Sequence, residues 1–279
     1  MKIFTFLILL MFCSISIAQK VNYSPLYFGP NANPVSQFSD ARIPTNTTIE
    51  LARENYFGFG DHTRNFKFSV EVPLFSERVS LKVWTAMLEQ WQVTQEIYDF
   101  RQMQGSELSG TANGDIYVQT RILILTENTV RPSIVLNSTL KTASGTQYLQ
   151  RRYFDTPGYY FDVEIGKSVH SGSRFLNEAR VVANAGFLCW ETTNSTQNDA
   201  IMYGGKIILS NRLFDFENTL AGYHGWMNNG DSPLVYFSRL TFKQANFNLF
   251  AQFQYGINDF PYYGVHIGIS RAFPKLTPK

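Results

Sequence analysis

The sequence is poor in cysteine and in charge, and both shortages restrict its class. Two cysteines occur among the 279 residues, and one of them, Cys13, lies in the N-terminal apolar stretch. With Cys189 alone remaining, we expect neither a disulfide framework nor a cysteine metal site. Charged residues make up 16% of the chain, against about a quarter in ordinary soluble domains. A net charge of +2 argues against a nucleic-acid partner.

Beyond its first residues, the chain lacks an apolar run long enough for a transmembrane helix. The exception is residues 3–12, which follow the basic Lys2 and are followed by small residues. This order predicts a cleaved signal peptide over residues 1–18 and therefore an exported protein. Cys13 would suit a lipid anchor, but the bulky Phe12 precedes it where a small residue is wanted.

What the sequence does contain is alternation of apolar and polar residues. In residues 263–270, apolar side chains hold the odd positions and polar residues or glycine hold the even ones. Successive side chains of a strand point to opposite faces, so each such stretch has one apolar and one polar face. We expect about twelve strands, at residues 47–59, 66–74, 79 onward, 115–125, 133–142, 159–167, 179–190, 201–209, 217–226, 234–242, 247–257 and 262–273.

This pattern predicts an all-β fold, an antiparallel transmembrane β-barrel over residues 47–279. The aromatic content of 15% fits the apolar wall and aromatic rims of such barrels. We therefore expect a location in the bacterial outer membrane, with membrane lipids and the outer-membrane assembly machinery as partners. A soluble β-sandwich or a lipocalin-like barrel is the structural alternative, because its strands alternate too.

Residues 19–46, the N-terminal segment, differ from the rest of the chain. Four prolines, at 25, 30, 34 and 44, exclude regular structure there. A disordered leader, a periplasmic segment and an inward-folded plug are all open, and the apolar side chains favour a segment packed on or inside the barrel.

The connections between the expected strands differ in length. With both termini on the periplasmic side, the short turns near residues 76, 126, 211 and 244 share one rim. The longer loops near residues 101, 147, 196 and 229 share the other. Short periplasmic turns and long outer loops are typical of outer-membrane barrels.

One part of the chain, residues 114–145, resembles a known family. Gly114-Asp115 opens one strand, and an LKxxxG sequence that begins at residue 140 closes the next. In these features the chain resembles the bacterial outer-membrane barrels grouped as meta-pathway phenol-degradation-like proteins. The resemblance implies an outer-membrane channel for small compounds, hydrophobic ones included, and it brings no catalytic residues.

The polar face of the expected strands carries charges of both signs. Such charges either close the interior with ion pairs or line a narrow aqueous path. The pattern favours interface girdles for the four tryptophans, Trp84, Trp91, Trp190 and Trp226, with binding of an aromatic or sugar ligand as the alternative. The predicted lumen-lining residues are Lys67, Glu71, Lys82, Asp115, Arg121, Lys141, Asp162, Glu164, Arg180, Lys206 and Arg239.

Catalytic and metal sites are not expected. His224 and Ser232 supply the residue types of an outer-membrane lipid hydrolase, but a serine nucleophile needs its base within hydrogen-bond reach. His62, His170 and His266 are scattered, whereas a metal site needs convergent ligands, and we expect no cofactor. The sequence thus favours a narrow channel or binding barrel for an unknown small solute. The alternatives are a closed structural or surface-interaction barrel and the lipid hydrolase.

Overall fold

The computed structural model describes residues 22–74, 77–171, 173, 175–191 and 199–276. The expected signal peptide lies outside the described residues. The described chain is almost entirely antiparallel sheet, with three short helices: η1 (Pro25–Tyr27), α2 (Gln95–Phe100) and η2 (Pro274–Leu276). Among the described residues, no helix has the length and apolar character needed to cross a membrane.

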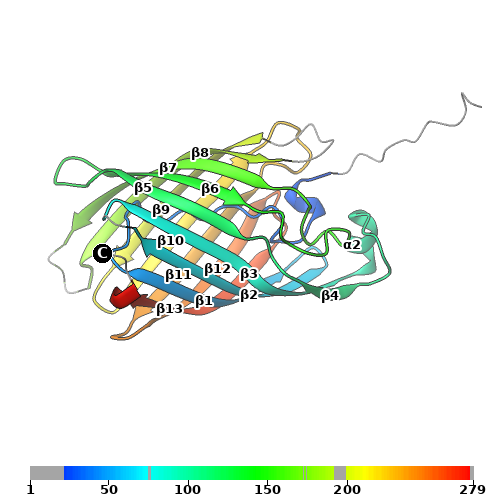
Figure 1. Ribbon diagram of the computed structural model, residues 1–279, viewed down its shortest axis with the longest axis horizontal. Helices are drawn as coiled ribbons and strands as arrows, with labels where there is room; N and C mark the ends of the chain where they lie inside the picture. Colours follow the sequence, from blue (N-terminus) through cyan, green and yellow to red (C-terminus); the bar gives the residue numbers. More distant parts are fainter. Residues whose placement is uncertain (1–21, 75–76, 172, 174, 192–198, 277–279) are drawn as a thin grey trace, which may run out of the picture.

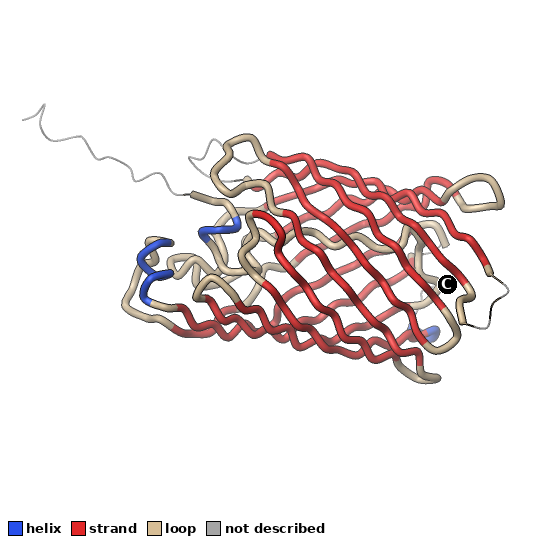
Figure 2. The backbone as a smooth tube through the Cα atoms, turned by 180° about the vertical axis from the view of Figure 1, so that it is seen from behind, coloured by secondary structure: helices blue, strands red, loops and turns tan. Residues whose placement is uncertain are grey.

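The sheet closes on itself into a barrel (Figures 1 and 2). Twelve long strands form the wall, each paired with its chain neighbours, and β1 also pairs with β13. The short β4 (Ser109–Ala112) extends the wall beside the far end of β3. The long strands are β1 (Thr47–Phe57), β2 (Asp61–Pro73), β3 (Val79–Val93), β5 (Tyr117–Leu125), β6 (Ser133–Lys141), β7 (Gly158–His170), β8 (Glu178–Trp190), β9 (Asp199–Ser210), β10 (Phe214–His224), β11 (Leu234–Lys243), β12 (Asn248–Asn258) and β13 (Tyr263–Phe273).

Alternation along each strand separates an outer from an inner surface. In β13, Val265 and Ile267 are 47% and 55% exposed, whereas His266 between them is 3% exposed. Val181 and Ile207 on other strands are likewise exposed. The outer wall is therefore apolar and the inner wall polar, and each of the twelve long strands has a paired strand on both sides. This confirms the predicted fold class and the number of strands.

The two rims have the predicted asymmetry. The connections after β2, β5, β7, β9 and β11 form the turn rim, and those after β1, β3, β6, β8, β10 and β12 form the loop rim. Helix α2 and β4 belong to the long connection between β3 and β5, and Figure 1 shows them at the opposite end from the C-terminus. The long polar connections thus gather at one end of the barrel.

Strand β3 extends further than its sequence pattern predicted. Met87 has no register partner, because Phe66 pairs with Leu88 while Lys67 pairs with Ala86. This bulge reverses the side-chain phase, so that Glu89 and residues 91 and 93 face inward beyond it. The extra residue interrupts the alternation of apolar and polar side chains. For this reason the sequence pattern of residues 90–93 resembled a polar loop.

The described part of the N-terminal segment, residues 22–46, runs lengthwise through the barrel. At the loop rim the Ser24 hydroxyl donates a hydrogen bond to the Asn229 carbonyl oxygen at 3.0 Å. At the turn rim Arg42 forms an ion pair with Glu178, at the start of β8. The expectation that both termini share one rim therefore does not hold for the described residues, because Asn22 lies near the loop rim and β13 ends at the turn rim. The segment enters at the loop rim and must cross the lumen to reach the start of β1.

Candidate functional site

The lumen is the candidate site, and Glu164 on β7 holds the N-terminal segment inside it. The Glu164 carboxylate accepts hydrogen bonds from the backbone N–H groups of Ser39 and Ala41, both at 2.9 Å. It also accepts from Arg121 at 3.2 Å and from Asn137 at 2.9 Å. Glu164 is 1% exposed. A carboxylate so surrounded fixes the segment to one wall of the barrel, because buried backbone N–H groups need acceptors.

Strands β8 and β9 continue this attachment. Lys206 donates to the Phe38 carbonyl oxygen at 2.6 Å, and the Arg180 Nε donates to the Asp40 carbonyl oxygen at 2.6 Å. The Phe38 ring lies directly over Gly204, where a Cβ atom would overlap it. Glycine is therefore needed at this position for the segment to lie flat against β9.

Near the loop rim, a network of fully buried charges surrounds the segment. Arg101 and Arg152 each form an ion pair with Asp61 at 2.6 Å, and Arg152 pairs with Glu89 at 2.6 Å. All four side chains are inaccessible to solvent, and Asn31 of the segment donates to Glu89. Sequence reasoning missed this network because Arg101 and Arg152 lie on connections and Glu89 lies beyond the bulge.

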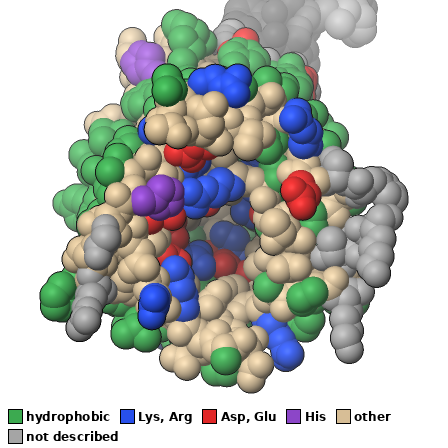
Figure 3. All heavy atoms as spheres, turned by 90° about the vertical axis from the view of Figure 1, so that its left-hand side faces the viewer, with side chains coloured by type: hydrophobic (Ala, Val, Ile, Leu, Met, Phe, Trp, Pro, Cys, Tyr) green, Lys and Arg blue, Asp and Glu red, His purple; other side chains and the backbone are tan. Residues whose placement is uncertain are grey.

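The part of the lumen that the N-terminal segment does not fill is hollow. A cavity of about 430 Å³ lies toward the turn rim, and one of about 190 Å³ lies deeper. Both are bounded by the N-terminal segment and by Lys82 and Arg239. Figure 3 shows the turn-rim end hollowed and lined by side chains of both charges. The ion pair of Glu50 with Arg239, at 2.7 Å, is about a quarter exposed.

The structure places the predicted lumen-lining residues in two environments. Seven are buried: Asp115, Arg121, Lys141, Asp162, Glu164, Arg180 and Lys206. Four are partly exposed: Lys67, Glu71, Lys82 and Arg239. Of these, Lys67, Lys82 and Arg239 face the cavities, whereas Glu71 pairs with Arg121 at 2.7 Å. Both of the arrangements expected for these charges, interior pairing and an open cavity lining, thus occur side by side.

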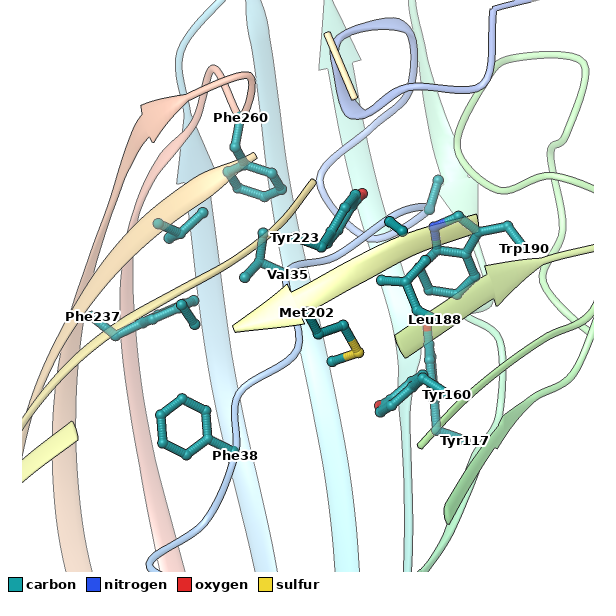
Figure 4. Packing of buried hydrophobic residues seen from close by; sticks show 14 of the residues in the cluster. Val35, Phe38, Tyr117, Tyr160, Leu188, Trp190, Met202, Tyr223, Phe237 and Phe260 are labelled. Atoms are coloured by element: carbon teal, nitrogen blue, oxygen red, sulfur yellow. The ribbon is translucent and has the colours of Figure 1, made fainter. Parts of the chain in front are cut away.

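Aromatic side chains also fill the interior, and the girdle assignment is wrong for three tryptophans. Trp91 and Trp190 are 3% and 6% exposed, and Trp84 lines the smaller cavity, whereas Trp226 is 61% exposed. Trp84 shares the inward face of Lys82, two residues earlier, which is a signal the sequence offered. Figure 4 shows Trp190 beside Leu188, and it shows Phe38 of the N-terminal segment at the other side of the view, below Phe237.

The motif residues of the family resemblance meet in one place. Lys141 forms an ion pair with Asp115 at 2.7 Å, and both side chains are inaccessible to solvent. The other Asp115 oxygen accepts from the Gly145 N–H at 2.7 Å. A Cβ at Gly145 would overlap the Tyr153 ring. The motif therefore fixes the ends of β5 and β6 to the connection after β6.

His224 and Ser232 come closer together than the sequence suggested. The Ser232 hydroxyl lies 2.8 Å from His224 Nδ1 on the exposed loop rim. Within the described chain, the other ring nitrogen of His224 has no hydrogen-bond partner that would orient it, and Trp226 packs edge-on at 6.5 Å. No group of three or more His, Cys, Asp or Glu side chains in the described ranges is arranged to hold a metal ion.

Comparison with known proteins identifies the fold but not the family. No family model matches the sequence, and no curated protein matches it. The structure is similar to the COG4313 outer membrane channel from Pseudomonas putida F1, with a TM-score of 0.56 and 11% identity, covering 85% of this chain and 100% of the other. It is also similar to the NanC porin, with a TM-score of 0.56 and 8% identity, covering 81% of this chain and 100% of the other. The chain has the fold of outer-membrane channel barrels.

Proposed function

We propose that this protein is a narrow channel or binding barrel for small solutes in the bacterial outer membrane, with the N-terminal segment as its plug. The exposed apolar side chains of the wall, such as Val181 and Ile207, suit contact with lipid. The difference in connection length between the two ends of the barrel supports a turn rim in the periplasm and a loop rim outside the cell. On this proposal residues 1–18 are a signal peptide that is removed on export.

The observation that carries the proposal is the hollow beside the N-terminal segment. The two cavities share lining residues, among them Gln37 of the segment, Lys82 and Arg239, so they adjoin along the lumen. A barrel built only for structure would be expected to fill this space with side chains. We assign Lys67, Lys82 and Arg239 to the wall of this path. Glu164, Arg180 and Lys206 hold the plug.

Kinship with the meta-pathway phenol-degradation-like group forms part of the proposal. It is supported by the junction of Asp115, Lys141 and Gly145, because residues shared with that group are in contact here. The similarities in fold to an outer-membrane channel and to a porin support the transport of small solutes.

Single-channel conductance in planar bilayers tests the plug. We expect Gly204→Val to raise the conductance of the refolded protein severalfold, because a side chain at this position would push Phe38 and its segment off β9. Gly205→Val is the matched control, since a Cβ at Gly205 meets no atom within 4 Å. We expect it to conduct like the wild type.

Two results would contradict the proposal. If wild type, Gly204→Val and Gly205→Val were all silent, a closed structural barrel would be favoured. If both valine variants conducted like an already open wild type, the segment would not restrict the lumen. Heat-dependent mobility on SDS gels would establish that each variant forms a closed barrel.

A further inference from the structure

Lys82 on β3 differs from the other predicted lumen cations. Within the described residues, each of the others has a carboxylate oxygen within 4 Å, and Lys82 has none. Nearby carboxylates are already held by other cations: Glu71 by Arg121 at 2.7 Å, and Glu50 by Arg239 at 2.7 Å. An ammonium group that faces a cavity without an ion-pair partner attracts an anion from solution.

A second polar group without a partner in the described chain lies in the wall of the same cavity. Tyr117 is 6% exposed, its hydroxyl has no hydrogen-bond partner within the described chain, and it lines the cavity of about 190 Å³ with Lys82. Buried hydroxyl groups are hydrogen-bonded in most proteins, so one without a partner in the wall of a cavity points to a missing ligand.

The two groups share an aromatic wall. The Lys82 ammonium lies 5.6 Å from the centre of the Trp84 ring. The Trp84 ring stacks on Tyr117, with centroids 5.0 Å apart and planes 10° apart. Phe237 and Phe250 face the same cavity from β11 and β12. Within the described chain, a ligand here would therefore meet one cation that has no ion-pair partner, Lys82, together with the tyrosine hydroxyl and several flat apolar surfaces.

We propose that Lys82, Tyr117 and Trp84 form a binding subsite for small aromatic carboxylates. The ligand's carboxylate accepts hydrogen bonds from the Lys82 ammonium and the Tyr117 hydroxyl, while its ring lies against the aromatic wall. This inference rests on the proposed function, because the ligand must enter the lumen. It specifies the anionic class of solute that the lumen retains.

Isothermal titration of the full-length refolded protein in detergent, with benzoate as the probe, tests the subsite. We expect Lys82→Gln to weaken benzoate binding roughly tenfold to a hundredfold, the effect of losing a hydrogen bond to a charged group. Tyr117→Phe keeps the stacked ring and should weaken binding by a smaller factor. Lys82→Arg keeps the charge and should retain most of the affinity.

Two controls separate this subsite from general attraction of anions. Lys243→Gln removes a cation that lies outside the smaller cavity and pairs with Asp215 at 2.7 Å, and it should leave benzoate affinity unchanged. Benzyl alcohol, which has the ring without the charge, should bind much more weakly than benzoate.

The assignment would be overturned if a folded Lys82→Gln barrel bound benzoate with the affinity of the wild type. It would also be overturned if the wild type bound benzoate and benzyl alcohol equally well, or did not bind benzoate. Because titration needs no conduction, the two proposals fail separately. Benzoate binding without conductance would overturn the channel and keep the subsite. Conductance without binding would do the reverse.

Discussion

The two sides of the lumen are built from the same residue types and behave differently. On β7–β9, Glu164 and Arg180 are each 1% exposed and bind the backbone of the N-terminal segment. On β1 and β11, Glu50 and Arg239 bind each other and remain about a quarter exposed beside the cavities. The comparison shows that charged side chains on the inner face of a strand do not by themselves determine whether the N-terminal segment covers that face.

The backbone of the N-terminal segment determines which wall of the lumen is covered. Its prolines and irregular path leave backbone N–H and carbonyl groups without sheet partners, and each such group needs a hydrogen bond when buried. Glu164 accepts two of these N–H groups, and Lys206 and Arg180 each donate to a carbonyl oxygen. Within the described chain, Glu50 and Arg239 on the other wall bind each other and not the backbone of the segment.

Replacing Glu164, which binds both the N-terminal segment and Arg121, should have the largest effect on the difference between the two sides of the lumen. We expect Glu164→Ala to destabilise the protein by about 3–5 kcal/mol, because it removes one partner of a buried ion pair. The loss should appear as a lower midpoint of urea unfolding in lipid vesicles, followed by tryptophan fluorescence. The same variant should expose the N-terminal segment to added protease. An unfolding midpoint equal to that of the wild type would show that Glu164 does not hold the segment.

The matching change on the open side should affect stability much less. We expect Glu50→Gln to change the free energy of unfolding by about 1 kcal/mol or less, because its ion pair with Arg239 is partly exposed. It should instead shift the reversal potential in a salt gradient toward anion selectivity, since Arg239 then lacks its counter-charge. An unchanged reversal potential with a large loss of stability would reverse the assignment of the two sides.

Much of the wall was predictable from the sequence, because alternation with a period of two is a local property. It located each of the twelve long strands and gave the inward phase of Arg121, Glu164 and Lys206 correctly. It failed past Met87, where one extra residue inverts the phase. The girdle interpretation misplaced Trp190, the last residue of β8, because a tryptophan at a strand end suits either a lipid interface or a packed lumen. It also misplaced Trp84, although the phase shared with Lys82 indicated an inward side chain.

The path of the N-terminal segment could not be predicted, although its packing on or inside the barrel could be expected. Its contacts join residues more than a hundred positions apart, such as Ser39 with Glu164 and Phe38 with Lys206. No local pattern specifies such pairs. Gly204 becomes informative only when Phe38 is seen above it.

Site-directed labelling in intact cells tests most directly whether the N-terminal segment crosses the lumen. In a Cys189→Ser background, Asn22→Cys places a thiol near the loop rim, and Thr45→Cys places one just before β1 at the turn rim. We predict that a membrane-impermeant maleimide labels Asn22→Cys on intact cells and labels Thr45→Cys only after the outer membrane is permeabilised. If both thiols required permeabilisation, the segment would begin and end on the periplasmic side, and the account of a threaded plug would be wrong.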